Sequence, residues 1–110
     1  MKVQLIRADE KLSCKVFDST FFFRRLKAAE RRAILDKHTD KGLIDYSAAG
    51  REMVEMAMIG WQDVYSGDEE IPFDRELIDS LPERVILSIQ TALNRVAEKE
   101  DLEIGNLLKN

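Results

Sequence analysis

Residues 46–82 read YSAAGREMVEMAMIGWQDVYSGDEEIPFDRELIDSLP, and this stretch decides the fold. Its first part predicts a helix that begins at Tyr46, with Asp45 as N-cap, and ends at Gly60 and Trp61. Apolar side chains cover roughly 200° of its helical wheel, where a surface helix needs a stripe of about 100°. We therefore expect this helix to contact neighbours on two sides and to lie at the centre of the fold, with Trp61 as a core anchor.

The second part of the stretch leads into a last helix. An acidic loop and the triplet Ile71-Pro72-Phe73 come first, and Asp74 then caps a short helix over 75–80. The last helix is expected at about 82–98, because its apolar residues recur at helical spacing and proline is tolerated in a first turn. Leu87 falls opposite its apolar face. The tail 99–110 either extends this helix or forms a separate docking peptide.

The N-terminal part predicts a small β-hairpin over about residues 10–26. Phe21 and Phe23 would share one face and pack on the helices, because a strand alternates its side chains and a small sheet cannot stand alone. Phe22 would point to the other face, either covered or exposed to a partner. Residues 27–38 follow as an alanine-rich helix. The expected fold class is α+β and helix-dominated: one domain of 110 residues, with a hairpin packed on three to four α-helices and a helical body over about 27–98.

The composition excludes several classes of protein. With 45% hydrophobic and 35% charged residues, the chain resembles a soluble globular domain. We find neither a long apolar run nor a signal peptide, so we expect a cytoplasmic protein. The single cysteine, Cys14, makes no internal disulfide and lacks companions for a zinc site. No nucleophile, metal set or phosphate loop is recognisable, so we expect a non-enzymatic protein without a cofactor or metal.

Charge is divided unevenly along the chain. Residues 1–41 hold 11 Lys or Arg against 6 Asp or Glu, and residues 42–110 hold 6 against 15, which gives +5 and −9. Such a division fits solvated faces that attract each other within one chain, or head-to-tail contact between copies. Because the central helix also offers more apolar surface than one small domain covers, we expect a homo-oligomer.

The order of several short motifs is more specific than any one of them. Gly60-Trp61, an acidic loop, Ile71-Pro72-Phe73 and Leu81-Pro82 precede the final amphipathic helix, and Phe23-Arg24-Arg25-Leu26 stands upstream with Glu30-Arg31. Over about residues 20–97 this arrangement resembles the tail assembly chaperones of long-tailed bacteriophages. One departure is Lys27, where the resemblance leads us to expect a Ser or Thr that caps the following helix.

The resemblance implies a chaperone that binds the tape-measure protein, the tail-tube protein or both during tail morphogenesis, in the cytoplasm of the bacterial host. A chaperone needs adaptable apolar surface, which methionine provides. Met56 and Ile59 are therefore candidate contacts, although both could instead be buried under the hairpin. The candidate partner-binding residues are Phe22, Met56, Ile59 and Leu87, and the residues of the structural motif are Gly60, Trp61, Ile71, Pro72, Phe73, Leu81 and Pro82.

A small DNA-binding regulator is the alternative, with residues 27–61 as a helix-turn-helix. Arg51 is the only base in its second helix, beside Glu52 and Glu55, so that helix would repel phosphate. We therefore expect no nucleic-acid ligand and no membrane partner.

Overall fold

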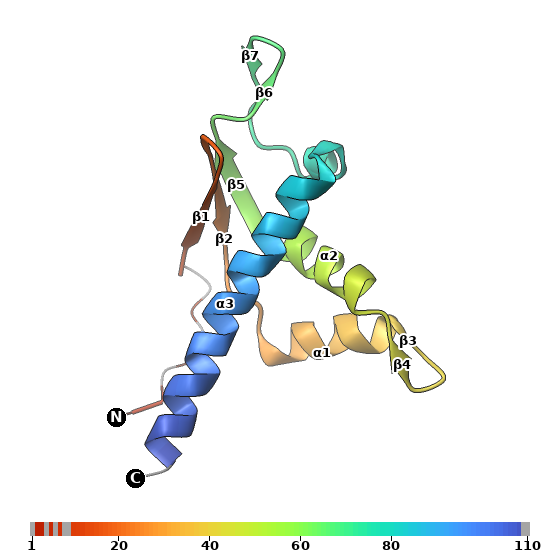
Figure 1. The fold of residues 1–110 in the computed structure, drawn as a ribbon, viewed down its shortest axis with the longest axis vertical. Coiled ribbons are helices and arrows are strands. Elements are labelled where there is room, and N and C mark those ends of the chain that lie inside the picture. The colour runs from red at the N-terminus through yellow and green to blue at the C-terminus, as the bar shows by residue number, and fades with distance from the viewer. Residues whose placement is uncertain (1, 4, 6, 8–9, 109–110) are drawn as a thin grey trace.

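The computed structural model describes the backbone of residues 2–3, 5, 7 and 10–108 and the side chains up to residue 95. Figure 1 shows a three-stranded sheet with the long helix α3 lying across it, and a small hairpin, β6–β7, that projects from one end. The elements in chain order are β1 (Leu12–Val16), β2 (Ser19–Phe23), α1 (Ala28–Lys37), β3 (Thr39–Asp40), β4 (Leu43–Ile44), α2 (Tyr46–Ala57), β5 (Met58–Gln62), β6 (Tyr65–Ser66), β7 (Glu69–Glu70), the 3-10 helix η1 (Arg75–Ser80) and α3 (Glu83–Leu108).

The expected fold class is wrong. In place of a helix-dominated fold with one N-terminal hairpin packed on three to four helices, the described residues form three small antiparallel sheets. The main sheet has the order β1-β2-β5, so the two N-terminal strands belong to a sheet that a later segment completes. The other two sheets are the short pairs β3–β4 and β6–β7.

The predicted central helix is the source of this error. It ends at Ala57, and Met58–Gln62 form strand β5 instead of its last turn. Met58 and Trp61 are both buried and three residues apart, so the pattern fits a helix as well as a strand that contains an irregularity. The pairing of Phe21 with Trp61 makes this segment a strand. Because the two residues are far apart in the chain, a local pattern of apolar residues could not have predicted this pairing.

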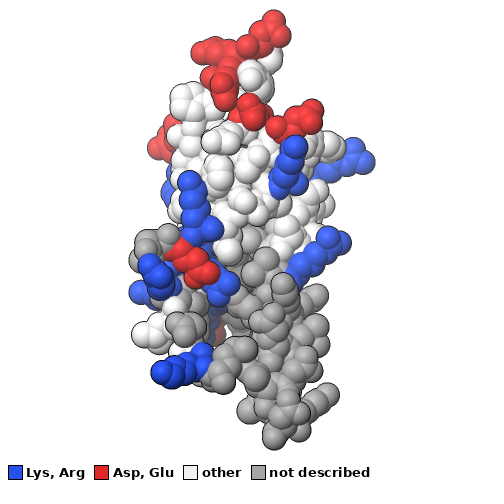
Figure 2. All heavy atoms as spheres, turned by 90° about the vertical axis from the view of Figure 1, so that its left-hand side faces the viewer, with Lys and Arg blue, Asp and Glu red and all other residues white. Residues whose placement is uncertain are grey.

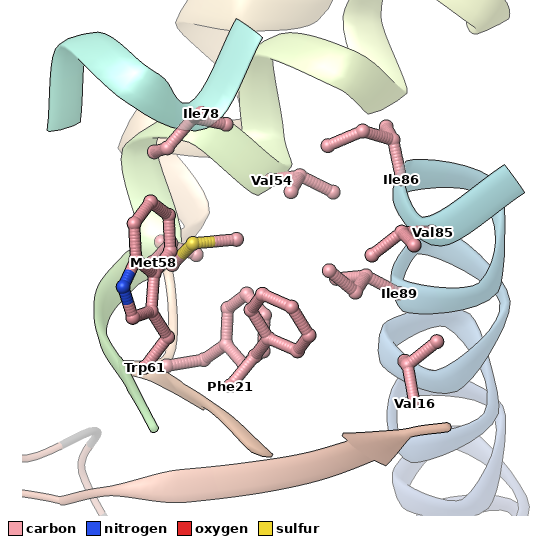
Figure 3. Close-up of a cluster of buried hydrophobic side chains, with 11 residues drawn as sticks. Val16, Phe21, Val54, Met58, Trp61, Ile78, Val85, Ile86 and Ile89 are labelled. Carbon is pink, nitrogen blue, oxygen red and sulfur yellow. The ribbon is translucent and has the colours of Figure 1, made fainter. Parts of the chain in front are cut away.

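Strand β2 is the middle strand and provides the centre of the core. Phe21 and Phe23 are 2% and 0% exposed, which confirms that they share the inward face. Val16, Met58 and Trp61 contribute from the flanking strands, and Ile86 and Ile89 of α3 pack against them (Figure 3). Each fully buried side chain of this size contributes about 1.5–3 kcal/mol relative to exposure, so this layer is the main source of stability.

Helix α1 is held mainly at its ends. Its only buried residue is Ile34. At the N-terminus Glu30 accepts a hydrogen bond from the backbone N–H of Lys27 at 3.0 Å. The Lys27 side chain has no acceptor atom, so only this half of the expected capping box forms. Arg24 adds a different contact at this end, because its guanidinium donates two hydrogen bonds to the Glu30 carboxylate at 2.9 and 2.8 Å.

One tight turn and two aspartate caps define the remaining elements. Lys41 and Gly42 both have positive φ (52° and 79°), as type I′ hairpin turns require, and they join β3 to β4. The Asp45 carboxylate accepts from Ala48 N at 3.1 Å and that of Asp74 from Glu76 N at 3.0 Å, which confirms both predicted caps. Helix α3 begins at Glu83 and continues to Leu108, so its backbone extends well beyond the predicted end near residue 98.

Candidate partner-binding surfaces

Trp61 organises the segment that carries most of the candidate residues. Its indole is 8% exposed, as predicted for a core anchor, and lies edge-on to Phe21 at 6.3 Å and to Phe73 at 5.0 Å between ring centroids. The indole N–H donates a hydrogen bond to the backbone oxygen of Ile71 at 2.8 Å. These contacts hold residues 71–73 against the sheet, with Phe73 and Leu81 packed on the core and Pro72 and Pro82 exposed.

Phe22 lies on the face of the sheet that points away from the core. It pairs across the ladder with Gly60, and a Cβ placed on Gly60 would lie 3.6 Å from Phe22 Cδ2. The ring therefore spreads over the bare backbone of the glycine, which half-buries it. On its other side the Lys11 ammonium stands 4.2 Å from the ring centroid. Phe22 was expected to be either covered or exposed, and it is partly both. Gly60 and Lys11 cover part of its ring, and the rest of the ring is exposed to solvent.

Ile59 lies directly beside this pair. The register of β2 with β5 shifts between Phe22 and Phe23, so Gly60 and Met58 have partners while Ile59 has none. As the extra residue of a bulge, Ile59 is turned out of the core and is 41% exposed. The structure therefore brings Phe22 and Ile59 to one face of the sheet, which we call the outer sheet face (Lys11, Phe22, Ile59 and Gly60).

Met56 lies in a different place, an open groove between α1, α2 and η1. We call it the Met56 groove; its volume is about 680 Å³. The half-buried Met56 and the side chains of Ala33 and Ile34 form its apolar part. The charged residues that line it are Arg24, Lys37, Glu52, Glu55, Arg75 and Asp79.

The charges of this groove are not equivalent. Arg24 is paired with Glu30, and Lys37 with Glu52 at 2.5 Å. Burial, followed by the neighbouring carboxyl group of Asp79, raises the pKa of Glu55. The groove therefore combines an apolar part with two like-charged carboxyl groups at its rim.

Leu87 is remote from both surfaces. It is 51% exposed on α3, whose other side carries Val85, Ile86 and Ile89 into the core. The inner face of the sheet packs against that buried side, so Leu87 and the outer sheet face lie on opposite sides of the molecule. The four candidate residues thus divide among three separate places. Their role in partner binding remains a prediction.

Sequence reasoning missed three residues of interest. Phe17, at the turn between β1 and β2, is 70% exposed and has φ 53°, a conformation that is unfavourable for a bulky residue. Tyr65 is 56% exposed on β6. Arg75 donates hydrogen bonds to the backbone oxygens of Glu55 and, at 2.7 Å, Met58. In the sequence, Phe17 and Tyr65 could have been identified only because they belong to no regular pattern of apolar residues. No sequence signal near Arg75 indicates its contacts.

Comparison of the chain with protein-family models, curated proteins and solved structures finds no match in any of the three. Among the described residues, no helix is both long and apolar enough to cross a membrane.

Proposed function

We propose that this chain is a non-enzymatic binding protein that serves as a tail assembly chaperone of a long-tailed bacteriophage. In this role it holds the tape-measure protein, the tail-tube protein or both in the host cytoplasm until the tube polymerises. One observation carries the proposal. Four of the residues on which the resemblance rests form one packed unit around Trp61, with Gly60 in the same strand, Ile71 as hydrogen-bond acceptor and Phe73 against the indole.

A chaperone of this kind also needs a surface that adapts to a client. The Met56 groove supports the proposal because a flexible thioether side chain lies beside small and branched apolar residues in an open depression. The outer sheet face adds Ile59 and part of the Phe22 ring. Both surfaces are apolar in the middle and charged at the rim, which is the usual anatomy of a protein–protein contact.

The helix-turn-helix alternative gains no support from the fold. The β3–β4 hairpin, residues 39–44, separates α1 from α2, whereas a helix-turn-helix joins its two helices by a turn of about 3–4 residues. In α2, Arg51 stands 4.0 Å from Glu55, so the single base of the supposed reading helix faces a carboxylate.

The test is co-expression with a tape-measure protein and a tail-tube protein from the same genome. We expect one of them to shift from the insoluble to the soluble fraction and to co-purify with the chain. Met56→Glu and Ile59→Glu, tested separately, should reduce that yield, because each places a charge in an apolar contact. Leu43→Glu, at a position that is 77% exposed on β4, is the matched control and should leave the yield unchanged. If folded wild-type protein neither binds nor solubilises either client, the proposal is wrong.

A further inference from the structure

The outward face of α1 is exposed and basic. Lys27, Arg31 and Arg32 are all exposed there, and we call them the basic face. Within the described part of the chain, no ion pair or hydrogen bond involves the guanidinium of Arg31 or Arg32. Ala28 and Ala29 are exposed on the same helix, so small side chains lie beside the long cationic ones. A partner backbone could therefore approach this helix closely.

The position of this face is fixed although α1 contributes little to the core. The bidentate pair of Arg24 with Glu30 holds its N-terminus, and the pair of Lys37 with Glu52 joins its C-terminus to α2. Because α1 buries only Ile34, these two pairs supplement its limited packing. The basic face therefore belongs to a helix that is joined to its neighbours at both ends.

The opposite kind of surface lies at the other end of the molecule. The β6–β7 hairpin, residues 65–70, projects from the body, and its two strands pair only with each other in the described residues. Tyr65, Asp68 and Glu69 are exposed on it. Figure 2 shows acidic side chains gathered at this end, with lysine and arginine side chains farther down the same view. We call residues 65–70 the acidic hairpin.

The two surfaces cannot meet within one copy. In Figure 1 the three-stranded sheet and α2 stand between the acidic hairpin and α1. Two copies can bring them together, because each copy carries both surfaces.

We propose that the acidic hairpin of one copy docks on the basic face of α1 of a second copy. Arg31 and Arg32 present planar donors that match carboxylates in bidentate geometry, which Asp68 and Glu69 supply. The exposed ring of Tyr65 offers a face on which a guanidinium can stack. The contact joins unlike surfaces, so it is head-to-tail and continues into a ring or a filament. This inference uses neither the Met56 groove nor the outer sheet face, and it stands or falls independently of the proposed client.

The experiment measures mass by light scattering over a concentration series at an ionic strength of about 0.01 M, where the Debye length is about 30 Å. We expect the wild-type mass to rise above the 12.7 kDa of one chain and to fall as salt is added. The double variants Asp68→Lys/Glu69→Lys and Arg31→Glu/Arg32→Glu should each stay monomeric, because each makes both surfaces alike in sign. Mixed in equal amounts, they should associate again, since every contact between a copy of one variant and a copy of the other joins opposite charges.

Arg84→Glu/Arg95→Glu is the matched control, a double reversal at exposed positions of α3 that should associate like wild type. Circular dichroism checks that each variant is folded, and Asp68→Asn/Glu69→Gln replaces the lysine variant if that one is not. The proposal is overturned if the wild type remains at 12.7 kDa throughout, if either reversal keeps full association, or if the mixture of folded variants stays monomeric.

Discussion

The indole N–H of Trp61 donates a hydrogen bond of 2.8 Å to the backbone oxygen of Ile71, ten residues later in the chain. This bond joins the two ends of the loop that contains the β6–β7 hairpin, so residue 71 lies beside β5. A second bond, from Ile71 N to the backbone oxygen of Val64 at 2.8 Å, lies beside it. Trp61 thereby fixes the base of the hairpin as well as the core.

Trp61→Ala should lower the free energy of unfolding by about 3–5 kcal/mol, because it removes a buried ring from between Phe21 and Phe73. Trp61→Phe should cost less than Trp61→Ala, because it keeps an aromatic ring. It still loses the hydrogen bond to Ile71, which accounts for about 1 kcal/mol of the difference between the phenylalanine variant and wild type. Chemical denaturation of the two variants beside wild type makes the measurement. A loss below about 1 kcal/mol for the alanine variant would show that the indole is not an anchor.

Local side-chain chemistry allowed the element ends to be predicted where one residue decides them. Asp45 and Asp74 cap helices as expected, because a short carboxylate reaches the free N–H groups of a first turn. The inward placement of Phe21 and Phe23 also followed from strand alternation alone. These features depend only on residues that are close in the sequence, so a single sequence is enough to predict them.

The features that could not be predicted depend on contacts distant in sequence. Strand β5 forms because Trp61 and Gly60 pair with β2, about forty residues earlier. The bulge at Ile59 allows Met58 and Trp61, which are spaced as in a helix, to lie on the same face of this strand. The same bulge exposes Ile59 beside Phe22, so one candidate surface arises from register alone. The bidentate pair of Arg24 with Glu30 likewise depends on how the chain bends between β2 and α1.

Acid should weaken the attachment of α1 in a defined pH range. Hydrogen bonds from Arg24, supplemented by the backbone N–H of Lys27, lower the pKa of Glu30 from 4.5 to about 2. Because the folded pKa lies below the unfolded one, the stabilisation is complete above pH 4.5 and is lost as the pH falls toward about 2. Glu30→Gln should lower stability at neutral pH and flatten this acid limb in a denaturation series. Asp36→Asn, exposed on the same helix, should leave the limb unchanged, and an unchanged limb in the Glu30 variant would contradict the assignment.

Arg75 should act as a clamp at the junction of α2 and β5. Its two terminal nitrogens donate to the backbone oxygens of Glu55, in the last turn of α2, and Met58, the first residue of β5. A helix end otherwise leaves a carbonyl such as that of Glu55 without a partner in the helix. Arg75→Ala should cost about 1–3 kcal/mol, and Arg75→Lys should restore only part of it, because an ammonium cannot span both oxygens as a fork does. Denaturant midpoints of the two variants decide the point, and equal midpoints for lysine and arginine would rule out the fork.

The last prediction concerns Glu55 and Asp79 at the rim of the Met56 groove. Burial raises the pKa of Glu55, and the carboxyl group of Asp79 raises it further, while Arg51 acts in the opposite direction. A raised folded pKa means that the folded state binds the proton more tightly, so stability falls as the pH rises through that pKa. Asp79→Asn removes the like charge and should increase the denaturant midpoint at neutral pH, with a gain that shrinks as Glu55 becomes protonated in acid. Asp40→Asn, at an exposed position of β3, is the control and should show no such pH-dependent gain. If Asp79→Asn destabilises the protein at neutral pH, Asp79 is stabilising through a contact other than its repulsion of Glu55.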